Sequence, residues 1–174
     1  STMAIIAETL GMSLPGSAAI PAVHADRLRA SEESGALATR LIGSELTPEK
    51  IITKASVENA LRALLAVSGS TNAVIHLAAI AGRLGIDVDL DQFNTLSADT
   101  RVLVNLEPVG DNYMEDCHAA GALEGVLRAI SDKLNKDTIS IVGETLAEWL
   151  AKPLADQIDH QVIRPADDPI DPLG

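Results

Sequence analysis

The chain has 174 residues, a formal net charge of −12 and a hydrophobic content of 47%, but only 2% of its residues are aromatic. This length is sufficient for one domain with a hydrophobic core. The negative charge argues against binding of nucleic acid or of an anionic membrane surface, because both would be repelled. The single cysteine, Cys117, excludes an internal disulfide framework and cannot hold a metal cluster by itself.

The part of the chain before Gly69 is predicted to form helices separated by turns. Apolar spacing predicts helices over residues 3–10 and 21–42, and Thr47-Pro48 predicts a short helical turn, because proline is favoured at the first helical position. Thr53 is expected to cap the next helix, whose buried stripe begins at Val57. His24 is predicted to be a surface histidine at a helix start, with a place in a substrate pocket as the alternative.

A turn of sequence Ser-Gly-Ser-Thr-Asn precedes an apolar segment, residues 73–84, in which only His76 and Arg83 are strongly polar. A helix that is apolar on nearly every side is expected to be buried on all of them. Ser70, Thr71 and Asn72 are residue types that cap helix N-termini. Two interpretations of these three residues stay open: ordinary capping, or a cradle for a carboxylate or phosphate at the helix start.

The second half alternates short apolar strands with helices. The expected elements are, in order, a capped helix start at 87–94, a strand at 102–106, a turn at Pro108 and Gly110, a helix at 114–134 broken near Gly121, a strand at 138–142, a helix at 145–151 and an edge strand at 162–163. This order predicts an α/β fold class: a layered helix–sheet–helix domain, predominantly helical with a few short strands.

The segment around Cys117 contains several potential metal ligands. On a helix, Glu115 and His118 would share one face, whereas Asp116 and Cys117 would point elsewhere. Two converging ligands are too few for a stable site. We therefore expect no metal site here, and a Cys117 that serves as a small buried hydrophobic residue.

Several motifs along the chain together resemble the family of dihydroxy-acid, 6-phosphogluconate and sugar-acid dehydratases. The segments that carry this resemblance are Ser1–Met3, Glu8–Gly16, Thr53–Ala60, Ser68–Leu77, Val104–Gly110, Met114–Gly121, Val142–Glu148 and Val162–Pro165. Two positions depart from the family pattern, because Ser68 and Ala122 stand where the family usually has glycine. Such a residue is tolerated only if its backbone does not need a positive φ.

The resemblance implies an enzyme that removes water from a 2,3-dihydroxy carboxylate to give a 2-keto acid, with an iron–sulfur cluster and Mg²⁺ as cofactors. The family's cluster cysteines, its Mg²⁺ ligands and its catalytic serine have no counterparts among these residues. The chain is therefore expected to be an inactive fragment with no catalytic residue, no metal ligand and no cofactor of its own. By the same resemblance, Ser1, Thr2, Ser70, Thr71 and Asn72 are expected to line or support the substrate pocket.

The resemblance also implies a domain organisation and partners. Residues 1–160 would be the C-terminal half of the N-terminal dehydratase domain, and residues 161–174 a linker toward a missing β-rich C-terminal domain. The loop Ser17–Arg27 is more similar to the pentonate, or sugar-acid, branch than to the branched-chain biosynthetic branch. We expect a cytoplasmic homo-oligomer, a dimer or tetramer, that binds a small hydroxy acid and neither nucleic acid nor membrane. The alternative is a non-catalytic acidic helical module for binding or oligomerisation.

Overall fold

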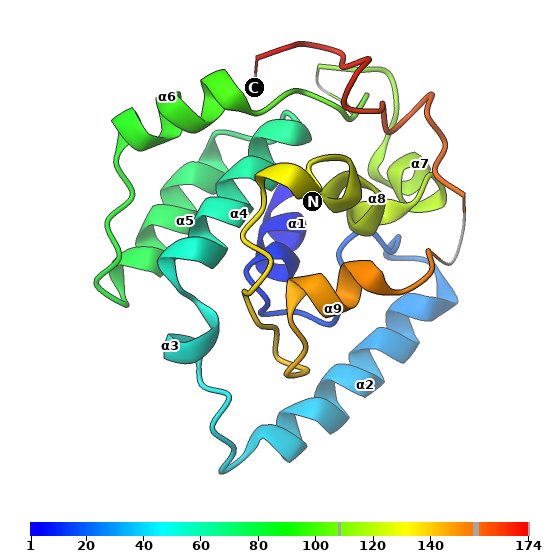
Figure 1. Cartoon of the computed structure of the whole chain (residues 1–174). Coiled ribbons are helices and arrows are strands. Elements are labelled where there is room, and N and C mark those ends of the chain that lie inside the picture. Colours follow the sequence, from blue (N-terminus) through cyan, green and yellow to red (C-terminus); the bar gives the residue numbers. More distant parts are fainter. Residues whose placement is uncertain (108, 155–156, 174) are drawn as a thin grey trace.

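The computed structural model describes residues 1–107, 109–154 and 157–173, so the turn predicted at Pro108 and the last residue of the predicted linker, Gly174, lie outside the described residues. Helices dominate, which confirms the predicted helical character of the domain (Figure 1). The elements are α1 (Thr2–Thr9), α2 (Ala25–Leu41), α3 (Pro48–Ile51), α4 (Lys54–Ala66), α5 (Asn72–Gly82), α6 (Leu90–Asp99), α7 (Met114–Ala119), α8 (Ala122–Ala129), the 3₁₀ helix η1 (Ser131–Lys133) and α9 (Leu146–Ala151).

Local capping signals in the sequence determine where several helices begin. The Thr53 side chain accepts a hydrogen bond from the Ser56 N–H at the start of α4, and Ser56 Oγ accepts one from the Thr53 N–H. Asp89 caps α6 in a similar way by accepting from the Gln92 N–H. Helix α2 begins at Ala25, later than predicted, because residues 21–24 form a turn that His24 closes as the N-cap. The half-exposed ring of His24 confirms its prediction as a surface residue.

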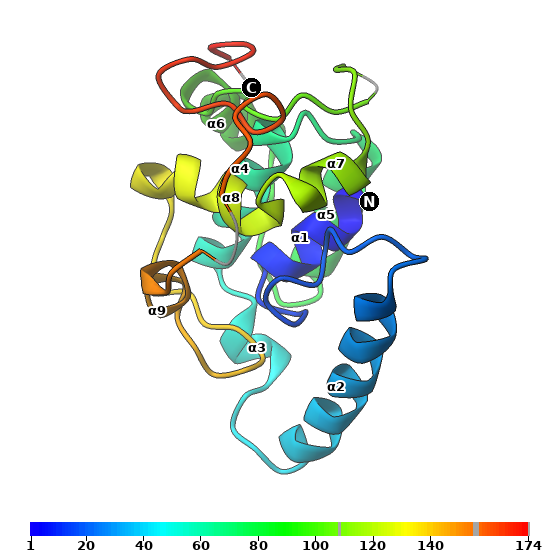
Figure 2. The same cartoon turned by 90° about the vertical axis from the view of Figure 1, so that its right-hand side faces the viewer.

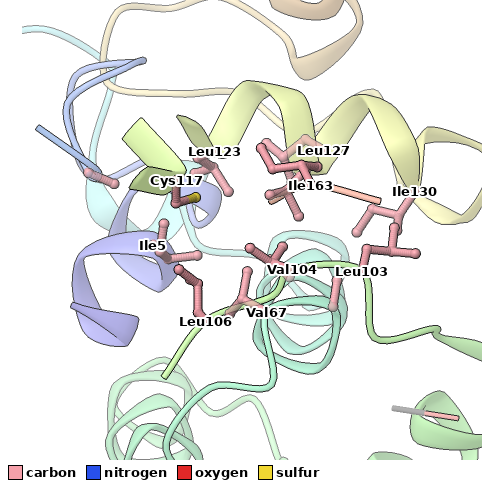
Figure 3. Packing of buried hydrophobic residues seen from close by; sticks show 14 of the residues in the cluster. Ile5, Val67, Leu103, Val104, Leu106, Cys117, Leu123, Leu127, Ile130 and Ile163 are labelled. Atoms are coloured by element: carbon pink, nitrogen blue, oxygen red, sulfur yellow. The ribbon is translucent and has the colours of Figure 1, made fainter. Parts of the chain in front are cut away.

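The helices form three layers, with α1 and α4 packed against each other in the middle (Figures 1 and 2). One apolar cluster fills the space between this pair and helices α5 and α6, and it contains Ile6, Leu61, Leu77 and Leu96. A second cluster lies on the opposite side, toward α7 and α8, and Figure 3 shows how its side chains meet. Helix α1 therefore packs against both apolar clusters, one on each of its sides. Helix α2 stands apart at the edge of the molecule, and Leu37 is its only buried residue (Figure 2).

The predicted strands are present only as isolated bridges in the described part of the chain. Val104 pairs with Ile163 and Val102 with Asp171, both antiparallel, and Ile139 pairs with Thr145. The backbone at residues 102–106 is instead satisfied by irregular partners, since the N–H groups of Leu103 and Val104 both donate to the carbonyl of Ala66, at the end of α4. The central layer is therefore a pair of helices rather than the expected sheet.

The expectation that the helix after residue 72 is buried on all sides is wrong for this chain. Only Ala73, Leu77 and Ala81 of α5 are buried, whereas Ile75 is 68% exposed. Helix α5 packs mainly against α1 and α4, and it shares an apolar cluster with Leu96 of α6. An apolar composition allows a helix to be buried on every side. In the described part of this chain, however, neighbouring elements cover only one face of α5.

The two departures from the family's glycine pattern both adopt a left-handed backbone conformation. Ser68 has φ = 47° and Ala122 has φ = 54°, and no other non-glycine residue in the described ranges has a positive φ. This conformation costs about 1–2 kcal/mol for residues with a Cβ atom. Both positions therefore have a backbone shape that suits glycine, although this chain has serine and alanine there.

Replacing either residue by glycine is expected to stabilise the domain. Glycine removes the left-handed cost but loses about 0.5–1 kcal/mol of unfolded-state entropy, so the net gain for Ser68→Gly or Ala122→Gly is about 0.5–1 kcal/mol. Urea unfolding followed by circular dichroism measures this gain. Ala79→Gly, on the exposed side of α5, is the control, and it should destabilise the domain by about 1 kcal/mol. A loss of stability in both turn variants would contradict the assignment of strain.

Candidate pocket wall at the starts of helices α1 and α5

The start of α1 lies directly against the turn that leads into α5. Thr2 Oγ1 accepts a hydrogen bond from the Ser70 N–H at 3.2 Å, which joins residues 68 positions apart. Gly69 makes this approach possible, because a Cβ atom there would lie 2.5 Å from Thr2 Cγ2 and 2.6 Å from Leu64 Cδ1. The structure thus brings together two of the residue groups that the sequence placed at one site.

The turn itself is shaped by the end of α4. The Gly69 N–H donates to the Leu64 carbonyl, the Ser68 N–H donates to the Leu65 carbonyl, and Ser68 has the left-handed conformation. Backbone groups left over at a helix C-terminus are commonly satisfied in this way. The chain then reverses, so that Ser70 faces Thr2 while α5 runs back along α4.

Ordinary side-chain capping, one of the two interpretations of Ser70, Thr71 and Asn72, is not what the structure shows at α5. Thr71 is the N-cap residue, but it has helical dihedral angles and its side chain accepts no capping hydrogen bond. Ser70 Oγ makes only a long local contact, 3.4 Å, with the Asn72 N–H. Helix α1 also begins without a side-chain cap. Two helix N-termini therefore lie side by side, and each favours negative charge nearby.

The five predicted residues do not all face the same space. Ser1 continues from Thr2, and its carbonyl accepts hydrogen bonds from the first turn of α1. Thr71 lines a depression of about 160 Å³, whose apolar walls include Leu64, Val74 and Phe93. Asn72 is exposed and is the first residue of α5. The structure joins Thr2 to Ser70 directly, whereas no hydrogen bond joins Ser1, Thr71 or Asn72 to Thr2 in the described part of the chain.

Two ionisable side chains, Cys117 and Arg27, lie near the start of α1. Cys117 is fully buried, which raises the pKa of its thiol to about 11 and confirms its predicted role as a buried hydrophobic residue. The imidazole rings of His24 and His118 meet edge to face at 5.8 Å.

These residues do not fit an iron–sulfur cluster or a divalent metal ion. Within the described ranges, no three His, Cys, Asp or Glu side chains converge as metal ligands. Cys117 is the one cysteine of the chain, and a thiol whose pKa is raised to about 11 resists the deprotonation that metal binding requires.

Two structural features of this chain were not predicted from the sequence. Gly69 allows the close approach of Thr2, and its signal was a glycine inside a hydroxyl-rich turn. Glu8, at the far end of α1, is 4% exposed and accepts hydrogen bonds from the backbone of Gly16 and Ala18. Nothing in its spacing distinguishes it from an ordinary surface glutamate.

Comparison with known proteins identifies the class to which this arrangement belongs. The family model described as the N-terminal domain of dihydroxy-acid/6-phosphogluconate dehydratases matches residues 1–149. The chain is a member of this family. It is 40% identical over 176 residues to the dihydroxy-acid dehydratase of Methanothrix thermoacetophila, and 41% identical over 174 residues to that of Geobacter metallireducens. The resemblance drawn from the sequence motifs is thereby confirmed.

The alignments include the whole of this chain but only part of each relative. Both alignments cover 100% of this chain, but they cover 32% and 31% of the two relatives. The chain therefore spans about a third of the length of the relatives that it matches. No helix in the described part of the chain is both long and apolar enough to cross a membrane.

Proposed function

We propose that residues 1–174 form part of a hydro-lyase that converts a 2,3-dihydroxy carboxylate into a 2-keto acid, and that they supply scaffold and pocket wall. The family membership and the names of the relatives support this reaction. The observation that carries the role of this segment is the contact between Thr2 and Ser70, because it fixes two uncapped helix starts beside each other. Adjacent helix N-termini favour an anionic group such as the substrate carboxylate.

In this proposal the reacting groups lie on other parts of the complete enzyme. An iron–sulfur cluster and Mg²⁺, which the family resemblance implies, would be held by residues outside this chain. The role of this chain is to orient the substrate. Thr2 holds the turn in place, and the N–H groups at the starts of α1 and α5 face the substrate. The isolated chain is then inactive. Residues 1–160 would belong to the N-terminal domain, and residues 161–174 would lead out of it.

The substrate class is the finer part of the proposal. The loop Ser17–Arg27 favours a sugar acid, whereas the relatives carry the name dihydroxy-acid dehydratase. We propose a sugar acid of the pentonate type and expect kcat/KM for it to exceed that for a branched-chain dihydroxy acid. Measurement of both values on the complete enzyme decides between them, and a preference for the branched substrate would overturn this part while leaving the reaction class intact.

A Thr2→Val substitution in the complete enzyme tests the role of the pocket wall. Valine keeps the shape of threonine but cannot accept the Ser70 N–H, so the turn loses its anchor. We expect kcat/KM to fall by roughly tenfold, since one hydrogen bond contributes about 1 kcal/mol and small misplacements reduce rates strongly.

The matched control is Thr39→Val on the exposed surface of α2, where the hydroxyl bonds only to the Ala36 carbonyl. This variant should keep its full activity. If both variants are equally active and equally stable, the contact between Thr2 and Ser70 does not support catalysis, and the start of α1 is not part of the pocket.

The proposal also includes a cytoplasmic homo-oligomer, which size-exclusion chromatography with light scattering of the complete protein tests. The acidic composition and the exposed apolar side of α5 around Ile75 are compatible with subunit contacts. A complete protein that forms oligomers without any dehydratase activity would instead favour the non-catalytic module.

A further inference from the structure

Glu8 is a buried carboxyl group for which the proposed reaction has no use. Its residue is 4% exposed, and none of the ion pairs in the described ranges includes it. One carboxylate oxygen accepts the Gly16 N–H at 2.8 Å, and the other accepts the Ala18 N–H at 2.5 Å. An isolated buried carboxylate is costly, so it needs a structural explanation.

The two hydrogen bonds tie one end of α1 to the loop that leads to α2. From Ala18 the chain reaches Ile20, whose carbonyl accepts a hydrogen bond from Arg27 in the first turn of α2. Helix α2 itself has little packing, with Leu37 as its only buried residue. The position of the α2 start therefore depends on the Gly16–Ala18 backbone, and that backbone depends on Glu8.

The protonation state of Glu8 decides whether both bonds can exist. The ionised carboxylate has two acceptor oxygens, whereas the protonated form carries a hydrogen on one of them, which then faces a donor N–H. Burial raises the pKa of the Glu8 carboxyl to about 7, and the hydrogen bonds from Gly16, Ala18 and Ser17 oppose the shift. Both forms are populated near neutral pH.

A small cavity lies beside Glu8. It has a volume of about 20 Å³, sufficient for one water molecule, and it is also lined by Ser140. Ser140 Oγ is buried and has no hydrogen-bond partner in the described part of the chain. A water molecule in this cavity would lie between two polar residues, Glu8 and Ser140.

The neighbouring charges around Glu8 are few. In the turn that closes the cavity, Glu144 is the titratable residue, and it pairs with Lys152 at 2.5 Å. Helices α8 and α9 contribute Leu127 and Trp149, which do not titrate, and the facing loop residues 16–18 carry no charge. Glu8 thus responds to pH without a charged partner to hold it in one state.

We propose that Glu8 is a pH-responsive tether, which in its ionised form holds the Gly16–Ala18 backbone against α1 and in its protonated form releases this segment together with the start of α2. This inference does not depend on the proposed catalytic role. It predicts two opposite effects of acidification. The local tether weakens, whereas the global stability rises, because protonation removes a buried charge.

The sign of the global effect follows from linkage. The pKa of Glu8 is about 7 in the folded chain and has an ordinary value of 4.5, so the stabilisation is fully present below pH 4.5 and is lost as the pH rises through 7. Between pH 5 and pH 8 the unfolding equilibrium constant should rise by roughly 10²-fold from this group. The difference between wild type and Glu8→Gln isolates that contribution, because glutamine does not titrate.

Amide hydrogen exchange by NMR on the whole chain tests the local effect. In the wild type, the protection factors of Gly16 and Ala18 should fall by roughly tenfold between pH 8 and pH 5, in line with the loss of one hydrogen bond to a charged acceptor. Glu8→Gln imitates the protonated form, since its amide also keeps only one acceptor oxygen, and we expect it to show at both pH values the protection that the wild type has at pH 5. Glu144→Gln is the matched control, which removes the other carboxyl group at the cavity and should keep the wild-type response.

Two results would overturn the tether. One is equal protection of Gly16 and Ala18 at pH 5 and pH 8 in the wild type, and the other is the same pH response in Glu8→Gln. If Glu8→Gln does not fold, the ¹³C carboxyl shift of Glu8 in the wild type provides the test. Its titration must then follow the same pH window as the two amides, and a mismatch between the two curves refutes the proposal.

Discussion

Replacing Gly11 by alanine is expected to lower the free energy of unfolding by about 3–4 kcal/mol. Gly11 ends the α1 segment with φ = +84°, and a Cβ atom there would lie 2.5 Å from the Ile139 carbonyl oxygen and 2.9 Å from the Ser140 Cα. Both obstacles are backbone atoms, which cannot rotate away. Overpacking contributes about 1–3 kcal/mol and the left-handed conformation about 1–2 kcal/mol. Urea unfolding monitored by the fluorescence of Trp149 measures the loss.

Gly16 provides a matched control for Gly11. Its φ of +85° is almost the same, but no heavy atom lies within 4 Å of the Cβ position. Gly16→Ala should therefore lower the free energy of unfolding only by the cost of the left-handed conformation, about 1–2 kcal/mol. Equal losses in the two variants would mean that the 138–145 turn does not pack against the end of α1.

Asn59→Ala is expected to destabilise the domain by about 3 kcal/mol. Asn59 is fully buried in α4, where its side chain accepts the Asn135 N–H at 2.8 Å and donates to the Asn135 carbonyl at 2.9 Å. It also donates to Thr138 Oγ1 at 3.3 Å. Truncation leaves the backbone groups of Asn135 without their partners, and each unsatisfied buried group costs about 1–3 kcal/mol.

Asn94→Ala on the exposed side of α6 is the control for Asn59→Ala, and it should change the stability by less than about 0.5 kcal/mol. Chemical denaturation of both variants in parallel provides the comparison. A loss below 1 kcal/mol for Asn59→Ala would show that water satisfies Asn135 and that the side chain of Asn59 is not the link between α4 and the 135–138 segment.

The helix starts could be predicted because their signals are local. Thr53 and Asp89 lie within three residues of the N–H groups that they cap, so the sequence contains both partners of each hydrogen bond. The same applies to Pro48 at the start of α3. Cys117 was also predicted correctly, because a lone cysteine without further converging ligands is most often buried.

Features that depend on distant contacts could not be predicted in this way. The apolar run of α5 did not reveal that only one of its sides would be covered, which left Ile75 exposed. The apolar run at residues 102–106 suggested a strand, but its N–H groups found the end of α4 at Ala66 instead. In both cases the outcome depends on contacts between segments that are distant in the sequence, and hydrophobic periodicity does not describe such contacts.

The candidate site was predictable in its parts but not in its assembly. Family motifs pointed to Ser1, Thr2 and Ser70 separately, and the fold joins Thr2 to Ser70 across 68 residues. The departures at Ser68 and Ala122 could be identified as unusual, but only the backbone shows that both adopt a positive φ. The role of Glu8 depends on the path of the loop after α1, which residue spacing does not determine.

The measurement that tests the central claim most directly compares the complete protein with the isolated chain of residues 1–174 in one assay for 2-keto acid release from 2,3-dihydroxy carboxylates. We predict that the complete protein, loaded with its iron–sulfur cluster and Mg²⁺, forms the 2-keto acid, whereas the isolated chain is folded by circular dichroism and forms none. A loaded complete protein that releases no 2-keto acid from either a sugar acid or a branched-chain substrate would contradict the account.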